Sequence, residues 1–231
     1  MPESTTHTTL RRQRWAVSAC LPLLNLVARW HHLAIEGDEH LPKEGPALLL
    51  VKHRATRDSL LLSHLLHQMT GRMANYLMKH RAAGLPPQFL ELFGGIPVIR
   101  PKDILQLKTR SQRHAALRRA RTMCEEAQAY VTWLYERGEL VVTYPEGTFY
   151  PDSLGPLYTS AIRQVYDLTY DRELIIPIVP IGTVYKNQRG LRSHAFFNIG
   201  PPFEATAFLS FASLIKALRE QLQILSDIND H

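Results

Sequence analysis

The run ALLLV, from Ala47 to Val51, constrains the fold of this chain more than any other stretch. Consecutive apolar residues without alternation are typical of a strand that is covered on both faces, as strands of a parallel sheet usually are. A Lys-His pair follows the run, and a leucine-rich segment with the start signal of a helix begins at Asp58. A buried strand that leads directly into a helix predicts an α/β protein.

The same alternation of strands and helices continues along the chain. We predict further strands at residues 74–78, 95–99, 139–144, 173–181 and 194–200, and helices at residues 58–69, 107–137, 157–170 and 207–225. Gly138 is placed to end the longest helix. Residues 1–9 predict a loose polar tail. No repeat or change of composition divides the rest, so we expect one α/β domain over residues 35–231, with a mostly parallel or mixed sheet flanked by helices.

The N-terminal part of the chain predicts contact with a membrane surface. Arginines at positions 11, 12 and 14 precede the apolar segment 15–27, which contains a proline at position 22. No apolar run reaches the ~20 residues needed to span a bilayer, and no clear cleavage pattern of a signal peptide follows. We interpret residues 10–34 as an amphipathic helical segment in the membrane interface, or alternatively as a helix that only packs on the domain. Its apolar face contains Trp15, Leu23, Leu24, Val27 and Trp30.

The charge balance favours an anionic partner. The chain has 27 Lys and Arg against 21 Asp and Glu, a formal net charge of +6. Such a balance suits an anionic membrane face, a phosphorylated substrate or nucleic acid. We expect no nucleic-acid partner, because the sequence contains no known binding module. Cys20 and Cys124 are far apart in the sequence and have neither a C-x-x-C motif nor zinc-ligand spacing, which predicts free thiols in a reducing compartment. His64 and His67 lack matched ligands elsewhere, so we expect no metal.

His53 and Asp58 form a candidate catalytic pair. His53 follows the buried strand, at the edge where open α/β sheets usually bind ligands. Asp58 can fold back across the turn and accept a hydrogen bond from the imidazole, which leaves the other ring nitrogen free to take a proton from a hydroxyl. The alternative is that Asp58 only caps the helix. No nucleophile motif accompanies the pair, which favours direct attack by a substrate hydroxyl over a covalent enzyme intermediate.

Two further stretches carry candidate binding residues. GGIPVIRP, residues 94–101, includes Arg100, whose guanidinium can bind a phosphate through two hydrogen bonds. VVTYPEGTFYPD, residues 141–152, leads from a buried strand into Glu146, Gly147 and Thr148. The carboxylate and the hydroxyl can bind a polyol, and the glycine lets the backbone approach closely. Taken singly, each stretch is equally typical of an ordinary strand end or turn.

Taken in order, these motifs resemble those of the glycerolipid acyltransferase superfamily, which includes the lysophosphatidate and glycerol-3-phosphate acyltransferases. The resemblance covers roughly residues 33–185, and three ordered motifs are far more specific than any one alone. It runs from the H-x-x-x-x-D motif of His53 and Asp58, through the stretch that ends in Arg100 and through PEGT, to IIPIVPIG at residues 175–182. A lead-in precedes the histidine motif and consists of Gly37, Leu41, Pro42, Gly45 and Pro46.

The resemblance implies an α/β acyltransferase that moves a fatty acyl group from a thioester, acyl-coenzyme A or acyl carrier protein, to a hydroxyl. His53 would be the general base and Asp58 its orienter, and Arg100 would hold a phosphorylated acceptor. Glu146, Gly147 and Thr148 would help to hold that acceptor, while Pro177 and Pro180 lie in the block near the acyl site. The expected acceptor is a lysophospholipid, first of all 1-acylglycerol-3-phosphate. No permanently bound cofactor is implied, and the protein would lie peripherally on the cytoplasmic side of a membrane.

The chain departs from the motifs of the superfamily in three places. Lys52 replaces the asparagine that often precedes the histidine, and Phe149 replaces an arginine that helps to bind phosphate. In a Phe-Lys-x-Gly element further along, Tyr158 replaces the lysine and Ser160 replaces the glycine. These changes leave two alternatives open: the same chemistry on another acceptor, and a catalytically silent membrane-surface protein. Basic residues between positions 100 and 121 can bind lipid headgroups, coenzyme A or the acyl carrier protein, or simply form a solvated helix face.

Overall fold

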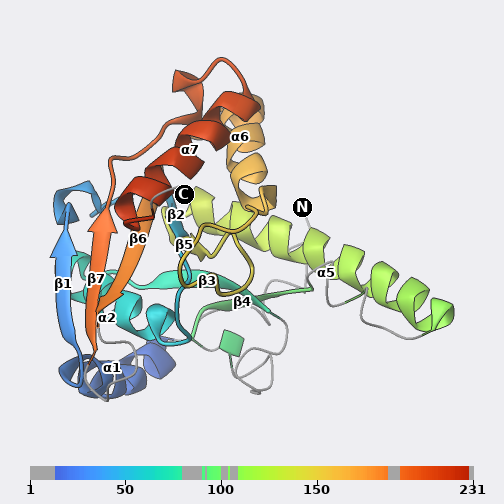
Figure 1. The fold of residues 1–231 in the computed structure, drawn as a ribbon. Coiled ribbons are helices and arrows are strands. Elements are labelled where there is room, and N and C mark those ends of the chain that lie inside the picture. The colour runs from blue at the N-terminus through green and yellow to red at the C-terminus, as the bar shows by residue number, and fades with distance from the viewer. Residues whose placement is uncertain are drawn as a thin grey trace.

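The computed structural model describes residues 14–79, 90–91, 93–99, 104, 109–186 and 193–228. The strands are β1 (His32–Glu36), β2 (Ala47–Val51), β3 (Ala74–Lys79), β4 (Gly95–Val98), β5 (Leu140–Thr143), β6 (Ile178–Lys186) and β7 (His194–Ile199). The helices are α1 (Arg14–Arg29), α2 (Asp58–Thr70), α5 (Arg110–Glu136), α6 (Ser160–Arg172) and α7 (Phe211–Leu225), with short 3-10 turns η1 (Asp38–His40) and η3 (Ala205–Ala207). Figure 1 shows their arrangement.

The described strands form one seven-stranded sheet in the order β1-β7-β6-β2-β5-β3-β4. Neighbouring strands run parallel, except β6 and β7, which are antiparallel. The sheet is therefore mixed, as the alternation of strands and helices predicted. β2 lies between β5 and β6 and is parallel to both, so three carboxyl ends meet near the centre of one sheet edge.

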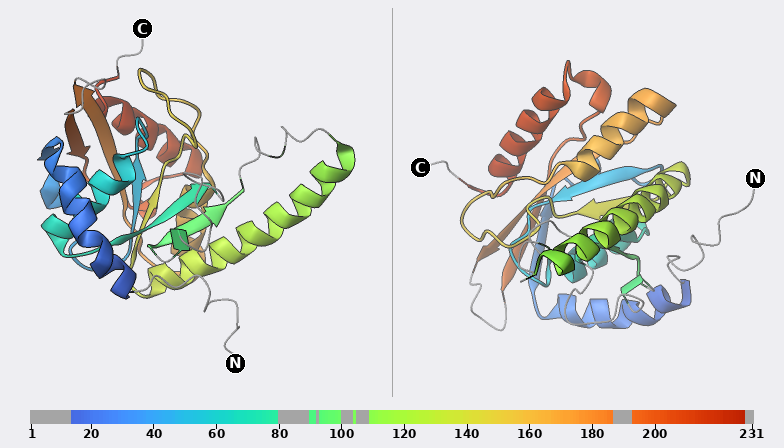
Figure 2. Two further views of the ribbon diagram at one scale, coloured as in Figure 1. Left: turned by 90° about the horizontal axis from the view of Figure 1, so that it is seen from below. Right: turned by 90° about the vertical axis from the view of Figure 1, so that its right-hand side faces the viewer.

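Helices cover both faces of the sheet, which explains the unbroken apolar run of β2. Leu48 and Leu50 belong to a core shared with α5, α6 and α7, whereas Leu49 and Val51 belong to a second core with α2. All five residues of β2 are buried. On the α2 side, α1 packs against α2 as an outer layer (Figures 1 and 2). The prediction of an α/β domain with a doubly covered sheet is confirmed.

The ends of α5 follow its sequence signals. Thr109 caps the helix: its hydroxyl accepts a hydrogen bond from the Gln112 amide, and the Gln112 side chain accepts one in return. Gly138 follows the helix with φ of +73°, a left-handed conformation that glycine adopts without strain. The prediction that Gly138 ends this helix is confirmed. The N-terminal half of α5 extends beyond the sheet (Figure 2).

Several boundaries differ from the sequence predictions. The helix predicted within residues 10–34 ends at Arg29, and His32–Glu36 forms the edge strand β1, which we did not predict. β1 is only partly buried, so it lacks the apolar run that marked the central strands. The strand predicted at 173–181 begins at Ile178 and continues to Lys186, and the last helix begins at Phe211 after a 3-10 turn. The tail predicted at residues 1–9 lies outside the described residues.

None of the helices described by the structure combines the length and apolar character that a membrane span requires.

Candidate active site

The candidate site lies at the carboxyl ends of β2 and β5. Because these strands are parallel neighbours, the residues that follow them leave the sheet side by side. Lys52 and His53 follow β2, and Glu146 lies shortly after β5. The His53 amide nitrogen lies 3.3 Å from Oε2 of Glu146, so two of the three sequence motifs meet here. This is the sheet edge where α/β proteins usually bind ligands.

His53 and Asp58 form the predicted pair. Nδ1 of His53 lies 2.9 Å from Oδ2 of Asp58. The Asp58 side chain is fully buried, whereas the His53 side chain is 16% exposed. Oδ2 of Asp58 also accepts hydrogen bonds from the amides of Arg54 at 2.8 Å and Ala55 at 2.9 Å. Since a carboxylate accepts at Nδ1, the imidazole carries its proton there and leaves Nε2 as a proton acceptor.

Tyr185 completes the surroundings of Asp58, and no sequence pattern pointed to it. β6 pairs Ile181 with Val51 and then continues along the same direction, so Tyr185 reaches the turn before α2. Its hydroxyl donates to Oδ1 of Asp58 at 2.5 Å. Burial, followed by the negative charge of Asp58, raises the pKa of Tyr185 well above its usual value. The phenol therefore keeps its proton and remains a donor to the carboxylate.

Two aromatic rings hold the imidazole of His53. The ring centroid of Tyr144 lies 4.1 Å away in a stacked arrangement, and that of Phe149 lies 4.3 Å away in a tilted one. Tyr144 is fixed by a hydrogen bond of 2.9 Å between its hydroxyl and that of Ser59. Phe149 is 44% exposed, so it forms an apolar surface beside the histidine. The phosphate-binding arginine of the superfamily is thus replaced by an aromatic ring that touches the candidate base.

Lys52 and Glu146 form a fully buried ion pair next to the backbone of His53. Nζ of Lys52 lies 2.9 Å from Oε1 and 2.8 Å from Oε2 of Glu146, and both side chains have no exposed area. Burial lowers the pKa of Lys52, while the hydrogen bond and the charge of Glu146 oppose this shift. Each carboxylate oxygen accepts one further hydrogen bond: Oε2 from the His53 amide and Oε1 from the Gly155 amide.

The other predicted site residues lie around this centre or outside the described part of the chain. Gly147 turns the chain after Glu146 with φ of +62°, and its amide donates to the Tyr144 carbonyl at 3.0 Å. Thr148 is half-buried in the same turn. Arg100 lies outside the described residues, so its predicted contact with phosphate stays a prediction. The binding roles predicted for Glu146, Gly147 and Thr148 also stay predictions.

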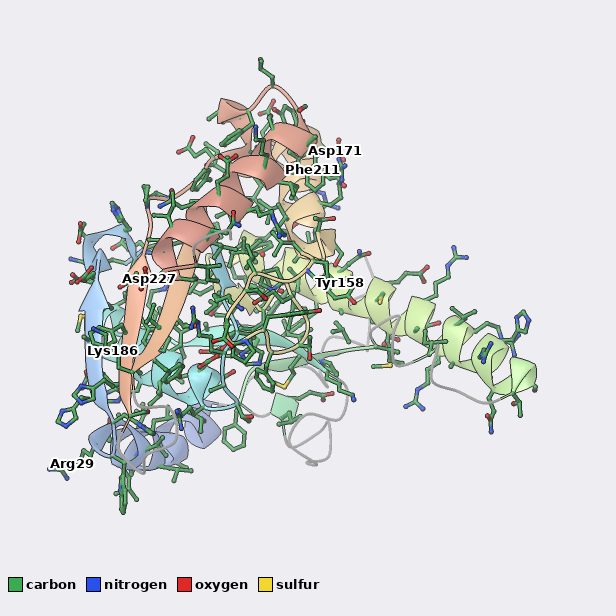
Figure 3. The ribbon with its side chains drawn as sticks, viewed as in Figure 1. Arg29, Tyr158, Asp171, Lys186, Phe211 and Asp227 are labelled. Atoms are coloured by element: carbon green, nitrogen blue, oxygen red, sulfur yellow. The ribbon has the colours of Figure 1, made fainter. Side chains whose placement is uncertain are left out.

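The basic residues near His53 are engaged with the protein itself. A terminal guanidinium nitrogen of Arg54 donates to the Ser226 carbonyl at 2.6 Å, and the guanidinium of Arg57 lies 4.8 Å from the ring centre of Tyr185. Burial lowers the pKa of Arg54, and nearby acidic groups, first among them Asp152, oppose the shift. Tyr158, which replaces the lysine of the superfamily, is 42% exposed in the segment before α6 (Figure 3).

No group of three or more His, Cys, Asp and Glu side chains among the described residues is arranged to hold a metal ion. The imidazole of His53, oriented by Asp58 and lying beside the partly exposed ring of Phe149, is suited to proton transfer. A hydroxyl that approaches Nε2 of His53 can lose its proton to that nitrogen as it attacks an electrophile.

Comparison with known proteins identifies a family and a similar fold for this chain. A family model described as Acyltransferase matches residues 32–184, about two thirds of the chain, and this range contains both strands that carry the site. Among solved structures, the chain is similar to the 1-acyl-sn-glycerophosphate (LPA) acyltransferase PlsC from Thermotoga maritima. The TM-score is 0.61 at 13% sequence identity, and the match covers 96% of this chain and 84% of that one. No curated protein matches the sequence significantly.

Proposed function

Because the chain belongs to the acyltransferase family, we propose that it moves a fatty acyl group from an acyl thioester to a hydroxyl of a lysophospholipid-type acceptor. The donor is acyl-coenzyme A or acyl carrier protein, and the first candidate acceptor is 1-acylglycerol-3-phosphate. The hydrogen bond between Nδ1 of His53 and Oδ2 of Asp58, at 2.9 Å, carries the proposal. The structural similarity of this chain to PlsC, an enzyme named for that acceptor, supports the choice of 1-acylglycerol-3-phosphate as first candidate.

The proposed reaction uses His53 as a general base. Nε2 takes the proton of the acceptor hydroxyl while the oxygen attacks the carbonyl carbon of the thioester. The tetrahedral intermediate then collapses and its carbon–sulfur bond breaks. The leaving thiolate takes the proton from the imidazolium, which restores the base. The buried carboxylate of Asp58 stabilises the imidazolium that exists between these two proton transfers.

A second candidate is the same transfer to an acceptor that has no phosphate near the reacting hydroxyl. Phe149 favours it, because an apolar ring 4.3 Å from His53 occupies a place where a phosphate would need a cation. Arg54 and Arg57 have contacts within the protein that hold them in their present positions. An acceptor with an apolar or uncharged group beside its hydroxyl suits this surface better than one with a phosphate there.

An acceptor panel separates the two candidates. Purified protein is incubated with radiolabelled palmitoyl-coenzyme A, or palmitoyl acyl carrier protein, and one acceptor at a time. We expect at least a tenfold preference in kcat/KM for one acceptor class, phosphorylated or not, and Phe149→Arg should shift it towards the phosphorylated class by roughly tenfold. If no acceptor yields a product, although the protein binds lipid vesicles, this result would support the catalytically silent alternative and contradict the proposed activity.

We also propose that the protein acts as a peripheral protein on the cytoplasmic face of a membrane. Exposed apolar side chains on α1 and directly after it support this: Leu23 and Leu26 of α1 are 53% and 55% exposed, and Trp30, which follows the helix, is 54% exposed. Leu23 and Leu26 are three residues apart and therefore neighbours on the helix surface. Leu24, which we predicted on the same apolar face, is instead buried, as is Ala28. Arg29 extends from α1 away from the sheet (Figure 3), where it can meet a lipid headgroup. The free thiol of Cys124 suits a reducing compartment.

Replacing two of these residues tests the membrane contact. We expect Leu23→Ser/Leu26→Ser to weaken binding to phosphatidylcholine–phosphatidylglycerol vesicles by roughly tenfold or more, because two apolar side chains no longer enter the bilayer. Binding is measured by co-sedimentation. The matched control is Leu209→Ser/Ile224→Ser, since Leu209 and Ile224 are equally apolar and even more exposed, but lie near or on α7. Equal losses in the two double variants would contradict a specific role of α1.

A further inference from the structure

Lys52 is a fully buried cation directly before His53, and its side chain contacts the segment that follows the neighbouring strand β5. Its ammonium donates to both carboxylate oxygens of Glu146, at 2.9 Å and 2.8 Å, and to the carbonyl of Tyr150 at 2.6 Å. These three acceptors account for its three protons. All of them belong to the segment that follows β5, whereas Lys52 itself follows β2. One side chain therefore ties the two strand ends that form the site.

The backbone of Lys52 is fixed from the other side by β6. Its amide donates to the Ile181 carbonyl at 2.9 Å, and its carbonyl accepts from the Thr183 hydroxyl at 2.8 Å. The side chain is thus held by the segment that follows β5, and the main chain by β6. His53 is the next residue, so its own backbone position depends on these contacts.

Glu146 also binds the backbone of His53 and the loop between Glu146 and Gly155. Its Oε2 accepts from the His53 amide at 3.3 Å, and its Oε1 accepts from the Gly155 amide at 2.8 Å. Between Glu146 and Gly155 lies Phe149, whose ring contacts the imidazole. The carboxylate therefore fixes the loop near both of its ends. A shift of this loop would move Phe149 and the imidazole relative to each other.

We propose that Lys52 is a positioning residue, and that its buried ion pair with Glu146 sets where His53 and Phe149 stand relative to the acceptor hydroxyl. This inference rests on the proposed function, since it assigns the pair a role in that reaction. It also changes the role predicted for Glu146. Both carboxylate oxygens have two donors within the protein and no exposed area, so Glu146 acts on the acceptor only through His53 and the loop.

Removing one partner of a buried ion pair costs much more free energy than removing both. Removing the ammonium leaves a carboxylate without a counter-charge in a place that water does not reach, so the carboxylate takes up a proton or the surrounding loop moves to rehydrate it. Removing both charges avoids that penalty. The effects of the two single changes are therefore expected to be non-additive.

A double-mutant cycle tests the proposal. We expect Lys52→Met and Glu146→Gln each to lower kcat by roughly 10- to 100-fold, with the acceptor KM changed less than about threefold, because the base is displaced but the acceptor contacts remain. The double variant Lys52→Met/Glu146→Gln should lose far less than the product of the two single losses. Steady-state rates are measured below the unfolding transition of every variant, with circular dichroism as the test of folding.

A control and the conservative variant separate positioning from general stability. Thr169→Val removes a buried hydroxyl that bonds within α6 and to the Leu174 carbonyl, so it lowers stability and leaves kcat unchanged. Lys52→Arg retains the charge and should keep more activity than Lys52→Met. A wild-type kcat for Lys52→Met would overturn the proposal, and so would a loss that lies mainly in acceptor KM. If Lys52→Met fails to fold, the test uses the double variant Lys52→Met/Glu146→Gln, which has neither charge, and compares its kcat with that of Glu146→Gln.

A measurement without turnover keeps this inference separate from the proposed function. The ¹⁵N-labelled imidazole of His53 is observed by NMR and assigned by its loss in His53→Ala. Lys52→Met should shift the ring-nitrogen signals of His53, and Thr169→Val should leave them in place. Unshifted signals in Lys52→Met would overturn the positioning role, even in a protein that proves inactive with every acceptor. Absence of turnover in the wild-type protein, with the shift present, would contradict only the proposed function.

Discussion

Replacing His53 by alanine is expected to lower kcat for acyl transfer by roughly 100- to 10,000-fold, the usual contribution of a general base. The acceptor hydroxyl would then have to lose its proton to water while it attacks the thioester. The KM of donor and acceptor should change little, because the imidazole contributes mainly to the transition state. Initial rates with saturating acyl-coenzyme A, or acyl carrier protein, and the preferred acceptor measure this effect.

Two comparisons show whether the loss comes from the base. His53→Phe keeps a ring between Tyr144 and Phe149, which lie 4.1 Å and 4.3 Å from the imidazole, but it has no nitrogen to take a proton. It should be as inactive as His53→Ala. His114→Ala removes an exposed histidine of α5 and should retain full activity. Turnover within tenfold of the wild type in either His53 variant would rule out the general-base role.

Local patterns predicted most of the central fold. The apolar run of β2, the helix that begins at Asp58 and the glycine after α5 depend on neighbours in the sequence, and all three appear as predicted. β1 did not, because an edge strand with partly buried side chains lacks both the apolar run and the clean alternation. Some strands end at other residues than predicted: β6 continues to Lys186 because β7 pairs with that end.

The site was predictable only in part, since most of its contacts join distant residues. His53 and Asp58 lie within one turn, so their pairing could be predicted from the sequence, with helix capping by Asp58 as the alternative. Tyr185 reaches Asp58 only because β6 lies beside β2, and no motif marks it. The bond between Lys52 and Glu146 joins residues 94 positions apart. From the sequence, Lys52 was a departure from the superfamily; the structure shows that it is the counter-charge of a motif residue.

Asp58 offers a way to separate orientation from charge. Its Oδ2 accepts three hydrogen bonds, from Nδ1 of His53 and from the amides of Arg54 and Ala55. Its Oδ1 accepts one, from the hydroxyl of Tyr185. An asparagine can keep this arrangement if its carbonyl oxygen takes the place of Oδ2. Its amide nitrogen then faces Tyr185, whose hydroxyl oxygen can accept a hydrogen bond.

Asp58→Asn should therefore keep the tautomer and orientation of His53 while it removes the negative charge. Without that charge, the imidazolium that forms during the reaction loses its counter-ion, so we expect kcat to fall roughly 10- to 1,000-fold. Asp58→Ala removes the orientation as well, and should approach the loss in His53→Ala. It also leaves the amides of Arg54 and Ala55 and the Tyr185 hydroxyl without their acceptor, which costs about 1–3 kcal/mol of stability for each group.

The order of the variants decides how the pair works. Rates are compared at a temperature where all variants are folded, with Asp167→Asn as the control for an exposed aspartate of α6. Tyr185→Phe should cost less than about tenfold in kcat, since Asp58 keeps its three other donors and its charge. If Asp58→Asn matched the wild type while Asp58→Ala did not, Asp58 would act by orientation alone. A fully active Asp58→Ala would mean that the aromatic rings of Tyr144 and Phe149 suffice to hold the base, and that the carboxylate serves only the turn before α2.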